Sequence, residues 1–283
     1  MKILTMENLK KYTTIRIGGT AAQLYIPESR EELMNLLTDL QGEEIRILSG
    51  GSNILMNDER VFPHVIYMEQ FDRELRHLGD GRFYCGASVR LQKLIQYTNE
   101  YGYGGIEYLM SVPGMIGGAV VMNAGRGRKH NQTISDYIVE VEVWQDGQVR
   151  KMSKQECQFS HRNSIFKHQN MVILSVVFQF LPEEKELLVE KRKARIEYSK
   201  NLQDNSRYNF GSVFCSCNNI AMRMIKRFQF CKKGEISFSK KTSNWLLNKG
   251  NGTFREAMTV MNKAERLNRL LGTKAEKEVI IWE

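Results

Sequence analysis

GGIEYLMSVPGMIGGAVVMNAGRG, residues 104–127, is the stretch on which the predicted fold depends. It contains seven glycines, one proline and no lysine, although the chain as a whole is rich in lysine. Glycine lets a backbone approach a ligand closely and adopt positive φ, at an entropic cost. We therefore expect the stretch to lie against a bound group, with a short helix starting near Gly117 whose free N–H groups attract an anion. The alternative is a glycine-rich loop between two packed elements.

A second glycine-rich segment lies upstream, where residues 47–55 read ILSGGSNIL. An apolar strand runs into Gly50, Gly51, Ser52 and Asn53. Consecutive N–H groups in such a turn form an anion-binding nest, and the serine and asparagine add side-chain donors. Because no lysine follows the glycines, the segment is not a nucleoside-triphosphate P-loop. We call residues 47–55 the first cradle and residues 104–127 the second cradle. Two such glycine-rich segments suit the pyrophosphate of a dinucleotide.

Length and composition indicate a globular chain of about two domains. It has 283 residues, of which 42% are hydrophobic and 26% charged. No apolar run approaches the ~20 residues needed to span a bilayer, and the N-terminus lacks a signal-peptide core. We therefore expect a cytoplasmic protein with no membrane partner.

The net charge of +9 favours anionic ligands or nucleic acid. No nucleic-acid-binding module is visible, and the dense basic run at 185–195 is interrupted by glutamates, as on a solvated helix face. We expect no nucleic-acid partner. The five cysteines have no spacing typical of a disulfide framework or a zinc site, so free thiols and no metal are expected.

The pattern of apolar residues predicts alternating strands and helices. A strand at 22–27 is followed by a helix that Ser29 caps, with Glu32 completing a capping box. Further helices are expected at 89–101, 184–202, 220–228 and 254–271. Further strands are expected at 45–48, 65–68, 82–86, 138–144, 171–181 and 278–282, with a hairpin turn at Asp146-Gly147.

Six stretches, taken in order, resemble those of the UDP-N-acetylenolpyruvoylglucosamine reductase family, whose flavin enzymes complete UDP-N-acetylmuramate in peptidoglycan synthesis. They are TTIRIGG (13–19), SGGSNIL (49–55), GIEYLMSVPGMIGGAVVMNAG (105–125), HRNSIF (161–166), GSVF (211–214) and EKEVII (276–281). The resemblance covers nearly the whole chain, and PGxxGGAxxMNAG is its most specific part. The chain is similar to the family's shorter type, which lacks a tyrosine-bearing lid.

The resemblance implies an α+β fold with non-covalent FAD and NADPH as co-substrate. A two-lobed FAD-binding domain of the vanillyl-alcohol-oxidase/PCMH type would occupy residues 1–182, with lobe one at about 1–60 and lobe two at about 61–182. A smaller α+β substrate-binding domain would occupy 183–283, with its C-terminal strand returning to the active site. The substrate would be a UDP-sugar, and the protein would be a monomer.

Three catalytic residues are implied by the same resemblance. Arg162 would grip the enolpyruvyl carboxylate through two parallel hydrogen bonds. Ser212 would deliver the proton that quenches the carbanion left at the α-carbon. Glu278 would stabilise the enol-like intermediate, and Glu276 is the alternative if the alignment slips by two.

The cofactor-binding residues are taken from the two cradles. Gly50, Gly51, Ser52 and Asn53 are expected at the pyrophosphate; Gly114, Gly117, Gly118 and Asn123 are expected beside the flavin; and Arg16 is expected to reach cofactor or substrate. Weaker candidates for diphosphate contacts are Lys240, Lys241, Asn244 and Asn248.

The chain departs from the family's usual pattern at His161, Cys215 and Lys277, where tyrosine, a residue of an Asn-Pro-type continuation and proline are usual. These departures leave open a paralogous flavoenzyme with another substrate, such as an oxidase. A non-catalytic flavin-binding protein is a third alternative, although Arg162, Ser212 and Glu278 are all retained.

Overall fold

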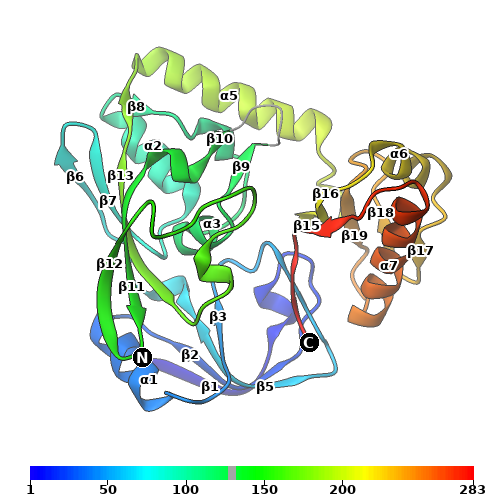
Figure 1. The fold of residues 1–283 in the computed structure, drawn as a ribbon, viewed down its shortest axis with the longest axis horizontal. Coiled ribbons are helices and arrows are strands. Elements are labelled where there is room, and N and C mark those ends of the chain that lie inside the picture. The colour runs from blue at the N-terminus through cyan, green and yellow to red at the C-terminus, as the bar shows by residue number, and fades with distance from the viewer. Residues whose placement is uncertain (127–131) are drawn as a thin grey trace. The chain divides into compact units, whose positions relative to one another are not determined.

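The structure is a computed structural model that describes residues 1–126 and 132–283. Residues 127–131, which include the last glycine of the 104–127 stretch, lie outside the described residues. The chain divides into two compact units. Unit 1 comprises Met1–Leu4, Leu24–Gly50 and His64–Glu197, and unit 2 comprises Thr5–Gln23, Gly51–Pro63 and Tyr198–Glu283. The predicted mixture of helices and strands is confirmed (Figure 1).

The main sheet of unit 1 has five antiparallel strands in the order β12-β11-β13-β7-β6. Its strands are β6 (Leu75–Gly79), β7 (Arg82–Gly86), β11 (Ile138–Gln145), β12 (Gln148–Ser153) and β13 (Val172–Gln179). Asp146 and Gly147 have φ of 50° and 82°, as the predicted two-residue hairpin turn between β11 and β12 requires. Strand β13 is buried along most of its length, because it lies in the middle of the sheet.

A second sheet has the order β1-β2-β5-β3. Its strands are β1 (Lys2–Asn8), β2 (Thr20–Ile26), β3 (Ile45–Leu48) and β5 (Val61–Tyr67), of which β3 and β5 are parallel. Helix α1 (Arg30–Asp39) connects β2 to β3. The Ser29 hydroxyl accepts the N–H of Glu32 at 3.2 Å, which confirms the predicted cap. The Glu32 carboxylate accepts the N–H of Glu28 at 2.8 Å and not that of Ser29, so the predicted capping box does not form.

Helices and short elements of unit 1 complete the core beside the five-stranded sheet. They are α2 (Leu91–Glu100), α3 (Ile116–Val121) and α5 (Lys185–Leu202), the short strands β8 (Tyr103–Gly104), β9 (Gly125–Arg126), β10 (Gln132–Thr133) and β14 (Leu181–Pro182), and 3-10 turns at Met68–Gln70, Glu107–Leu109, Ile134–Tyr137 and Ile165–Lys167. One continuous apolar cluster joins α1, α2, α3 and the sheet. The glycine-rich stretch of unit 1 is therefore fixed by packing on both sides.

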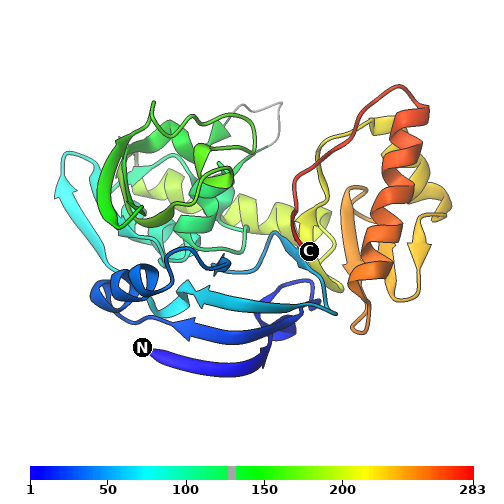
Figure 2. The ribbon, with the colours of Figure 1, turned by 60° about the horizontal axis from the view of Figure 1, so that its bottom comes forward.

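Unit 2 contains a four-stranded sheet in the order β15-β19-β18-β17. The strands are β15 (Tyr208–Ser212), β17 (Lys232–Lys233), β18 (Ile236–Phe238) and β19 (Trp245–Asn248). Helices α6 (Asn219–Phe228) and α7 (Phe254–Leu270) share a core with this sheet, and Figure 2 shows α7 lying lengthwise beside it. Thr253 and Glu256 form a complete capping box at the start of α7.

Two short pairs in unit 2 bring distant segments together. Strand β21 (Ile280–Trp282) runs parallel to β4 (Ile54–Met56), and β20 (Glu276–Lys277) pairs with β16 (Phe214–Ser216). The predicted strand at 278–282 is observed only at Ile280–Trp282, and β20 is a separate strand that precedes the predicted range. A 3-10 turn at Leu9–Tyr12 completes the unit. Within the described residues, no helix is long and apolar enough to cross a membrane.

The five cysteines differ in burial, and this difference sets their reactivity. Burial raises the pKa of Cys231 to about 11 and that of Cys157 to about 12, and it raises the pKa of Cys85 well above its usual range. Cys215 and Cys217 are only half-buried. We expect iodoacetamide at pH 8 to label these two in the native protein and to spare the other three, because the thiolate is the nucleophile. Peptide mass spectrometry checks this result, and labelling of Cys85 before denaturation would contradict it.

Candidate active site

Within unit 1, the structure brings Ser49 and Gly50, from the first glycine-rich segment, against the second segment. A Cβ atom placed on Gly50 would lie 3.2 Å from the Cα of Gly114, and one placed on Gly118 would lie 3.2 Å from Oγ of Ser49. The first cradle thus begins against the loop and helix of the second. Residues far apart in the sequence form one surface, as the prediction of a shared ligand requires.

The first two N–H groups of helix α3 donate to carbonyls of the segment that joins β7 to α2. The N–H of Ile116 donates to the carbonyl of Val89 at 2.9 Å, and that of Gly117 donates to the carbonyl of Ala87 at 2.8 Å. These bonds fix the start of the helix against the five-stranded sheet. The predicted anion attraction at this helix start is therefore wrong for these two groups, because their N–H groups already have acceptors.

Buried hydroxyl groups without a hydrogen-bond partner lie beside the cradles. Among the described residues, the side-chain oxygens of Ser49, Ser111 and Tyr108 in unit 1 and of Thr14 in unit 2 are buried and unsatisfied. Such an arrangement is costly unless a ligand or water completes the bonds. Ser49 adjoins Gly118, Ser111 precedes Gly114 in the same loop, and the N–H of Thr14 donates to the carbonyl of Gly51 at 3.0 Å. Within unit 1, the unsatisfied hydroxyls of Ser49, Ser111 and Tyr108 therefore fit a polar ligand such as FAD.

The sequence alone did not identify these four hydroxyl groups. Ser49 and Ser111 each stand close to a glycine of a cradle within an otherwise apolar run, and that position was the available signal. Burial raises the pKa of the Tyr108 phenol above its usual range, the nearby Tyr137 and Asp136 raise it further, and Arg162 lowers it. Tyr108 is therefore a neutral donor near the Arg162 guanidinium.

The two cradles respond differently to an added methyl group. A Cβ on Gly51, whose φ is +59°, would lie 1.9 Å from the backbone oxygen of Tyr12, whereas one on Gly118 meets only Ser49. We expect Gly51→Ala to lower the melting temperature of the flavin-free protein. Gly118→Ala should leave it unchanged or raise it, since alanine favours a helix by ~1 kcal/mol over glycine.

Flavin retention then separates ligand contact from folding. Gly118→Ala should lower the flavin-to-protein ratio after gel filtration, because the methyl group intrudes on the cradle beside Ser49. Circular dichroism melting and the visible spectrum measure the two effects. A Gly118→Ala protein that retains flavin as the wild type does would remove Gly118 from the cofactor site.

In unit 2, the first cradle continues into a hydrogen-bonded link with the C-terminal segment. The Asn53 side-chain nitrogen donates to the carbonyl of Glu278 at 3.0 Å, and the N–H of Ile280 donates to the carbonyl of Asn53 at 3.1 Å. Asn53 was predicted as a side-chain donor to a pyrophosphate. Its amide nitrogen instead positions the backbone at Glu278.

The segment that carries Ser212 lies beside Glu278. The N–H of Glu278 donates to the carbonyl of Val213, the residue after Ser212, at 2.8 Å. Lys277 and Phe214 are paired in β20 and β16, so Glu276 is one step further from the serine, opposite Ser216. The structure thus favours Glu278 over Glu276 as the glutamate next to Ser212.

Ser212 stands at a bulge where β15 meets β19. Gly211 has φ of +81°, which suits glycine, and this conformation turns the strand just before the serine. The Ser212 side chain is half-buried and has no hydrogen-bond partner among the described residues. Its hydroxyl is therefore available to a substrate.

Asn244 clamps the strand that follows Ser212. Its side-chain oxygen accepts the N–H of Phe214 at 3.2 Å, and its side-chain nitrogen donates to the carbonyl of Phe214 at 2.7 Å. Its backbone carbonyl accepts the N–H of Val213 at 2.9 Å. These hydrogen bonds give the Asn244 side chain a structural role. They do not support the predicted contact between Asn244 and a diphosphate.

Asn248 is fully buried and its amide is satisfied. It donates to the carbonyl of Ile15 at 2.9 Å and accepts the N–H groups of Gly250 and Gly252, both at 2.9 Å. The predicted diphosphate contact is wrong for Asn248, because its side chain is fully buried and bonded to backbone groups. Lys240 and Lys241 are exposed, and the Lys241 ammonium donates to the carbonyl of Lys200 at 3.0 Å.

Arg162 occupies a tight turn between Ser160 and Asn163, whose backbones are bonded to each other. Its φ is +56°, a conformation that costs roughly 1–2 kcal/mol for a residue other than glycine. The guanidinium donates to the carbonyl of Gly125 at 2.8 Å. Left-handed residues of this kind cluster at functional sites, where the surrounding structure holds them in place.

Two further predicted site residues, Asn123 and Arg16, are also left-handed, with φ of 42° and 58°. The side chain of Asn123 donates to the carbonyl of Ser160 at 2.9 Å and accepts the N–H of Ser135 at 3.3 Å. It therefore fixes the Arg162 turn against the end of the glycine-rich stretch, and only its backbone remains for a flavin. Arg16 lies in unit 2, donates to the carbonyl of Lys11 at 2.6 Å and stacks over the ring of Tyr208.

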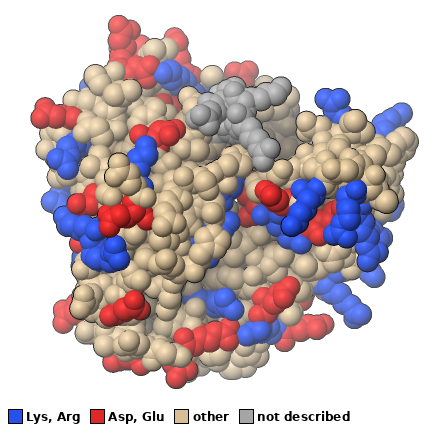
Figure 3. Space-filling view, viewed as in Figure 1, with Lys and Arg blue, Asp and Glu red and all other residues tan. Residues whose placement is uncertain are grey.

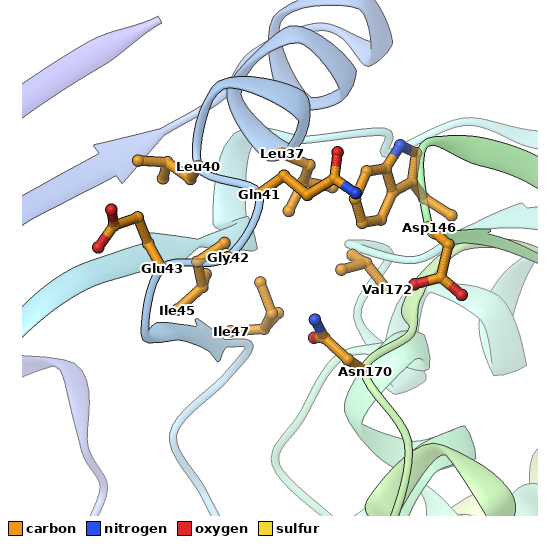
Figure 4. Close-up of a pocket in the computed structure, with 11 residues that line it drawn as sticks. Leu37, Leu40, Gln41, Gly42, Glu43, Ile45, Ile47, Asp146, Asn170 and Val172 are labelled. Carbon is orange, nitrogen blue, oxygen red and sulfur yellow. The ribbon is translucent and has the colours of Figure 1, made fainter.

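A small pocket of unit 1 lies apart from all of these residues. It is lined by the end of α1, the start of β3 and the β11–β12 hairpin (Figure 4). Ile47 and Val172 form part of its apolar wall, and Asp146 and Asn170 lie on its other side. None of the predicted site residues lines it, so it is not the cofactor cradle.

Comparisons with known proteins agree with the family resemblance over the whole length of the chain. Residues 21–153 match the family model described as an FAD binding domain. UDP-N-acetylenolpyruvoylglucosamine reductase of Moorella thermoacetica is 30% identical over 100% of this chain and 94% of its own, and that of Fusobacterium nucleatum is 29% identical over 99% of both. The crystal structure of UDP-N-acetylenolpyruvylglucosamine reductase from Thermus caldophilus has a TM-score of 0.79 and 26% identity, and covers 100% of this chain and 98% of that one.

The fold is shared more widely than the activity. The structure of 6-hydroxy-D-nicotine oxidase from Arthrobacter nicotinovorans superimposes with a TM-score of 0.51 at 16% identity, over 64% of this chain. This likeness concerns the fold alone. It agrees with the predicted two-lobed scaffold for FAD, and the chain carries an FAD-binding domain.

Proposed function

Because the chain belongs to the UDP-N-acetylenolpyruvoylglucosamine reductase family, we propose that it is an FAD-dependent reductase that uses NADPH to reduce the enolpyruvyl group of UDP-N-acetylenolpyruvoylglucosamine. The product is UDP-N-acetylmuramate, a precursor of peptidoglycan. The family assignment rests on relatives of 30% identity or more that span nearly the whole chain. The proposal adds to this family assignment the substrate, the reductant and the residues that act on them.

The observation that most directly supports this chemistry is the hydrogen bond between the Glu278 N–H and the Val213 carbonyl. It holds the segment with the proposed proton donor, Ser212, beside the segment with Glu278, which is proposed to stabilise the enol-like intermediate. Asn244 and Asn53 fix the two segments from either side. Both residues are thus on rigid backbone, as a proton transfer at a defined atom requires.

Each proposed catalytic residue has one task. Arg162 binds the substrate carboxylate and withdraws charge from the double bond. FAD held by the glycine-rich segments would supply the hydride for the β-carbon, with NADPH as its source. The Ser212 hydroxyl gives its proton to the α-carbon, and Glu278 stabilises the enol-like charge that precedes this step.

The proposed cofactor-binding residues come from the two glycine-rich segments. Gly50, Gly114, Gly117 and Gly118 would let FAD approach the backbone, and Gly51 and Ser52 would bind its pyrophosphate; Ser49, Ser111, Tyr108 and Thr14 would complete their hydrogen bonds on it. We assign the FAD-binding domain to residues 1–182 and the substrate-binding domain to 183–283. No cysteine or histidine lies within 47–55 or 104–125, so the proposed FAD is non-covalent.

Two of the three departures from the family pattern, at Lys277 and Cys215, are accommodated by local contacts. Lys277 forms an ion pair with Glu265 of α7, and the Cys215 thiol donates to the carbonyl of Glu276 at 3.5 Å. Neither contact involves Ser212 or Glu278 side chains. These contacts give no support to a different substrate, and the paralogous flavoenzyme remains an outcome of the test.

The test is to purify the protein, record its visible spectrum and follow NADPH oxidation with and without UDP-N-acetylenolpyruvoylglucosamine. We expect a flavin spectrum and oxidation that depends on the substrate. Flavin with no substrate-dependent oxidation would point to the paralogue, and a protein that takes up no FAD would overturn the cofactor site.

We further propose that the enzyme acts in the cytoplasm as a monomer without nucleic acid.

A further inference from the structure

The net positive charge of the chain is concentrated in its last part. Residues 198–283 contain sixteen Lys and Arg but only seven Asp and Glu, a difference equal to the +9 of the whole chain. Residues 205–234 contain six basic residues and no acidic residue. This run includes Ser212, but most of its charge lies further on, in and just after α6.

Four of these basic residues face solvent without a counter-charge. Arg223 and Arg227 on α6, and Lys232 and Lys233 just after it, are exposed. None of them forms a hydrogen bond or ion pair with another described residue through its side chain. They therefore form an uncompensated positive surface, which attracts anions.

Apolar side chains lie next to this charge. Ile220, Met224 and Phe228 are spaced four apart and so share one side of α6; Ile220 is 64% and Phe228 67% exposed. Phe230 follows the helix and is 44% exposed. The opposite side of α6 is already used, because Ala221, Met222 and Ile225 are buried in the core of unit 2.

The exposed side of α6 thus has two properties in one place. In the region where Figure 1 labels α6, Figure 3 shows mainly uncharged surface with basic side chains at its margin. Exposed phenylalanines beside arginine and lysine are typical of helices that lie in the interface of an anionic membrane. A site for a free polyanion needs the charges but not the two aromatic rings.

We propose that the exposed side of α6, together with Phe230, Lys232 and Lys233, binds the surface of an anionic phospholipid bilayer. Ile220, Phe228 and Phe230 enter the headgroup region, and the four basic residues contact lipid phosphates. This is a peripheral contact, so it revises the expectation of no membrane partner without requiring a spanning helix. It is independent of the proposed reaction.

The experiment is co-sedimentation of the purified full-length protein with large unilamellar vesicles. We expect binding to vesicles of phosphatidylcholine with 40% phosphatidylglycerol in 0.1 M NaCl, and little binding in 0.5 M NaCl or to pure phosphatidylcholine. Arg223→Gln/Arg227→Gln should weaken vesicle binding by roughly 30-fold, at ~1 kcal/mol per basic residue near the surface. Phe228→Ser/Phe230→Ser should weaken it at least about tenfold.

Matched changes on α7 of the same unit control for charge and hydrophobicity. Arg266→Gln/Arg269→Gln removes the same charge from exposed positions, and Leu270→Ser alters a side chain that is 82% exposed. These variants should bind vesicles like the wild type. No binding to anionic vesicles, or equal losses on α6 and α7, would overturn the proposal. If the arginine variant loses vesicle binding but the phenylalanine variant does not, the membrane proposal is overturned. The surface would then bind an acidic protein or another polyanion.

Discussion

Arg162→Lys should lose most of its turnover while it keeps its flavin. Lysine retains the positive charge but has no planar pair of donors, so it cannot bind a carboxylate through two parallel hydrogen bonds. A loss of one such charged pair costs roughly 2–4 kcal/mol, or about 30- to 1,000-fold in kcat/KM. Steady-state NADPH oxidation against substrate concentration measures the loss.

The control separates this effect from damage to the turn. Arg162 also donates to Gly125 and has a left-handed backbone, so a change in folding is the main competing explanation. Flavin content and melting temperature should match those of the wild type, and those of Arg90→Lys, a change at an exposed ion pair with Glu69. Near-normal turnover in Arg162→Lys would remove this guanidinium from the mechanism.

The sequence predicted the elements of the fold well where local signals are strong. Ser29 caps α1, Asp146-Gly147 turns the β11–β12 hairpin, and β3 and β7 have the predicted bounds. In each case a local signal, such as a cap, a turn or an apolar alternation, agrees with the tertiary structure. Strand β1 was missed, because its exposed residues show no buried face.

Which cradle residues present a side chain to a ligand could not be predicted from the sequence. Asn53 and Asn123 looked like donors, yet both amides bond to backbone groups of distant segments. Ser49 and Ser111 looked unremarkable, yet their hydroxyls are the unsatisfied ones. The difference depends on partners that are far away in the chain, and no spacing rule reports it.

Hydrogen bonds around Glu278 link three segments that are far apart in the sequence. The residue is held by Asn53, which ends the first cradle, and by Val213, which follows the proposed proton donor. Strands β4 and β21 extend this link in parallel. Within unit 2, a single segment thus connects Asn53 with Glu278, the residue proposed to stabilise the intermediate, and with the strand that carries the proposed proton donor.

Ser212→Ala should separate the two half-reactions. Reduction of FAD by NADPH needs no proton at the substrate, so it should proceed at close to the wild-type rate. Reoxidation by the enolpyruvyl substrate should slow by about 10²- to 10⁴-fold, the usual contribution of a positioned acid, which corresponds to roughly 3–5 kcal/mol. Ser212→Cys should recover part of this loss, because a thiol still donates a proton.

Stopped-flow absorbance at the flavin band measures both half-reactions in the same sample. The matched control is Ser216→Ala, two residues beyond Phe214 on β16, which removes a hydroxyl from the same segment without touching the proposed donor. A structural role for Ser212 would depress both half-reactions together and lower flavin occupancy, since the bulge at Gly211 would shift. Equal slowing of both steps, or of neither, would return Ser212 to the status of an ordinary serine at a strand bulge. Selective slowing of reoxidation in Ser212→Ala, with Ser216→Ala unchanged, would identify its hydroxyl as the source of the proton.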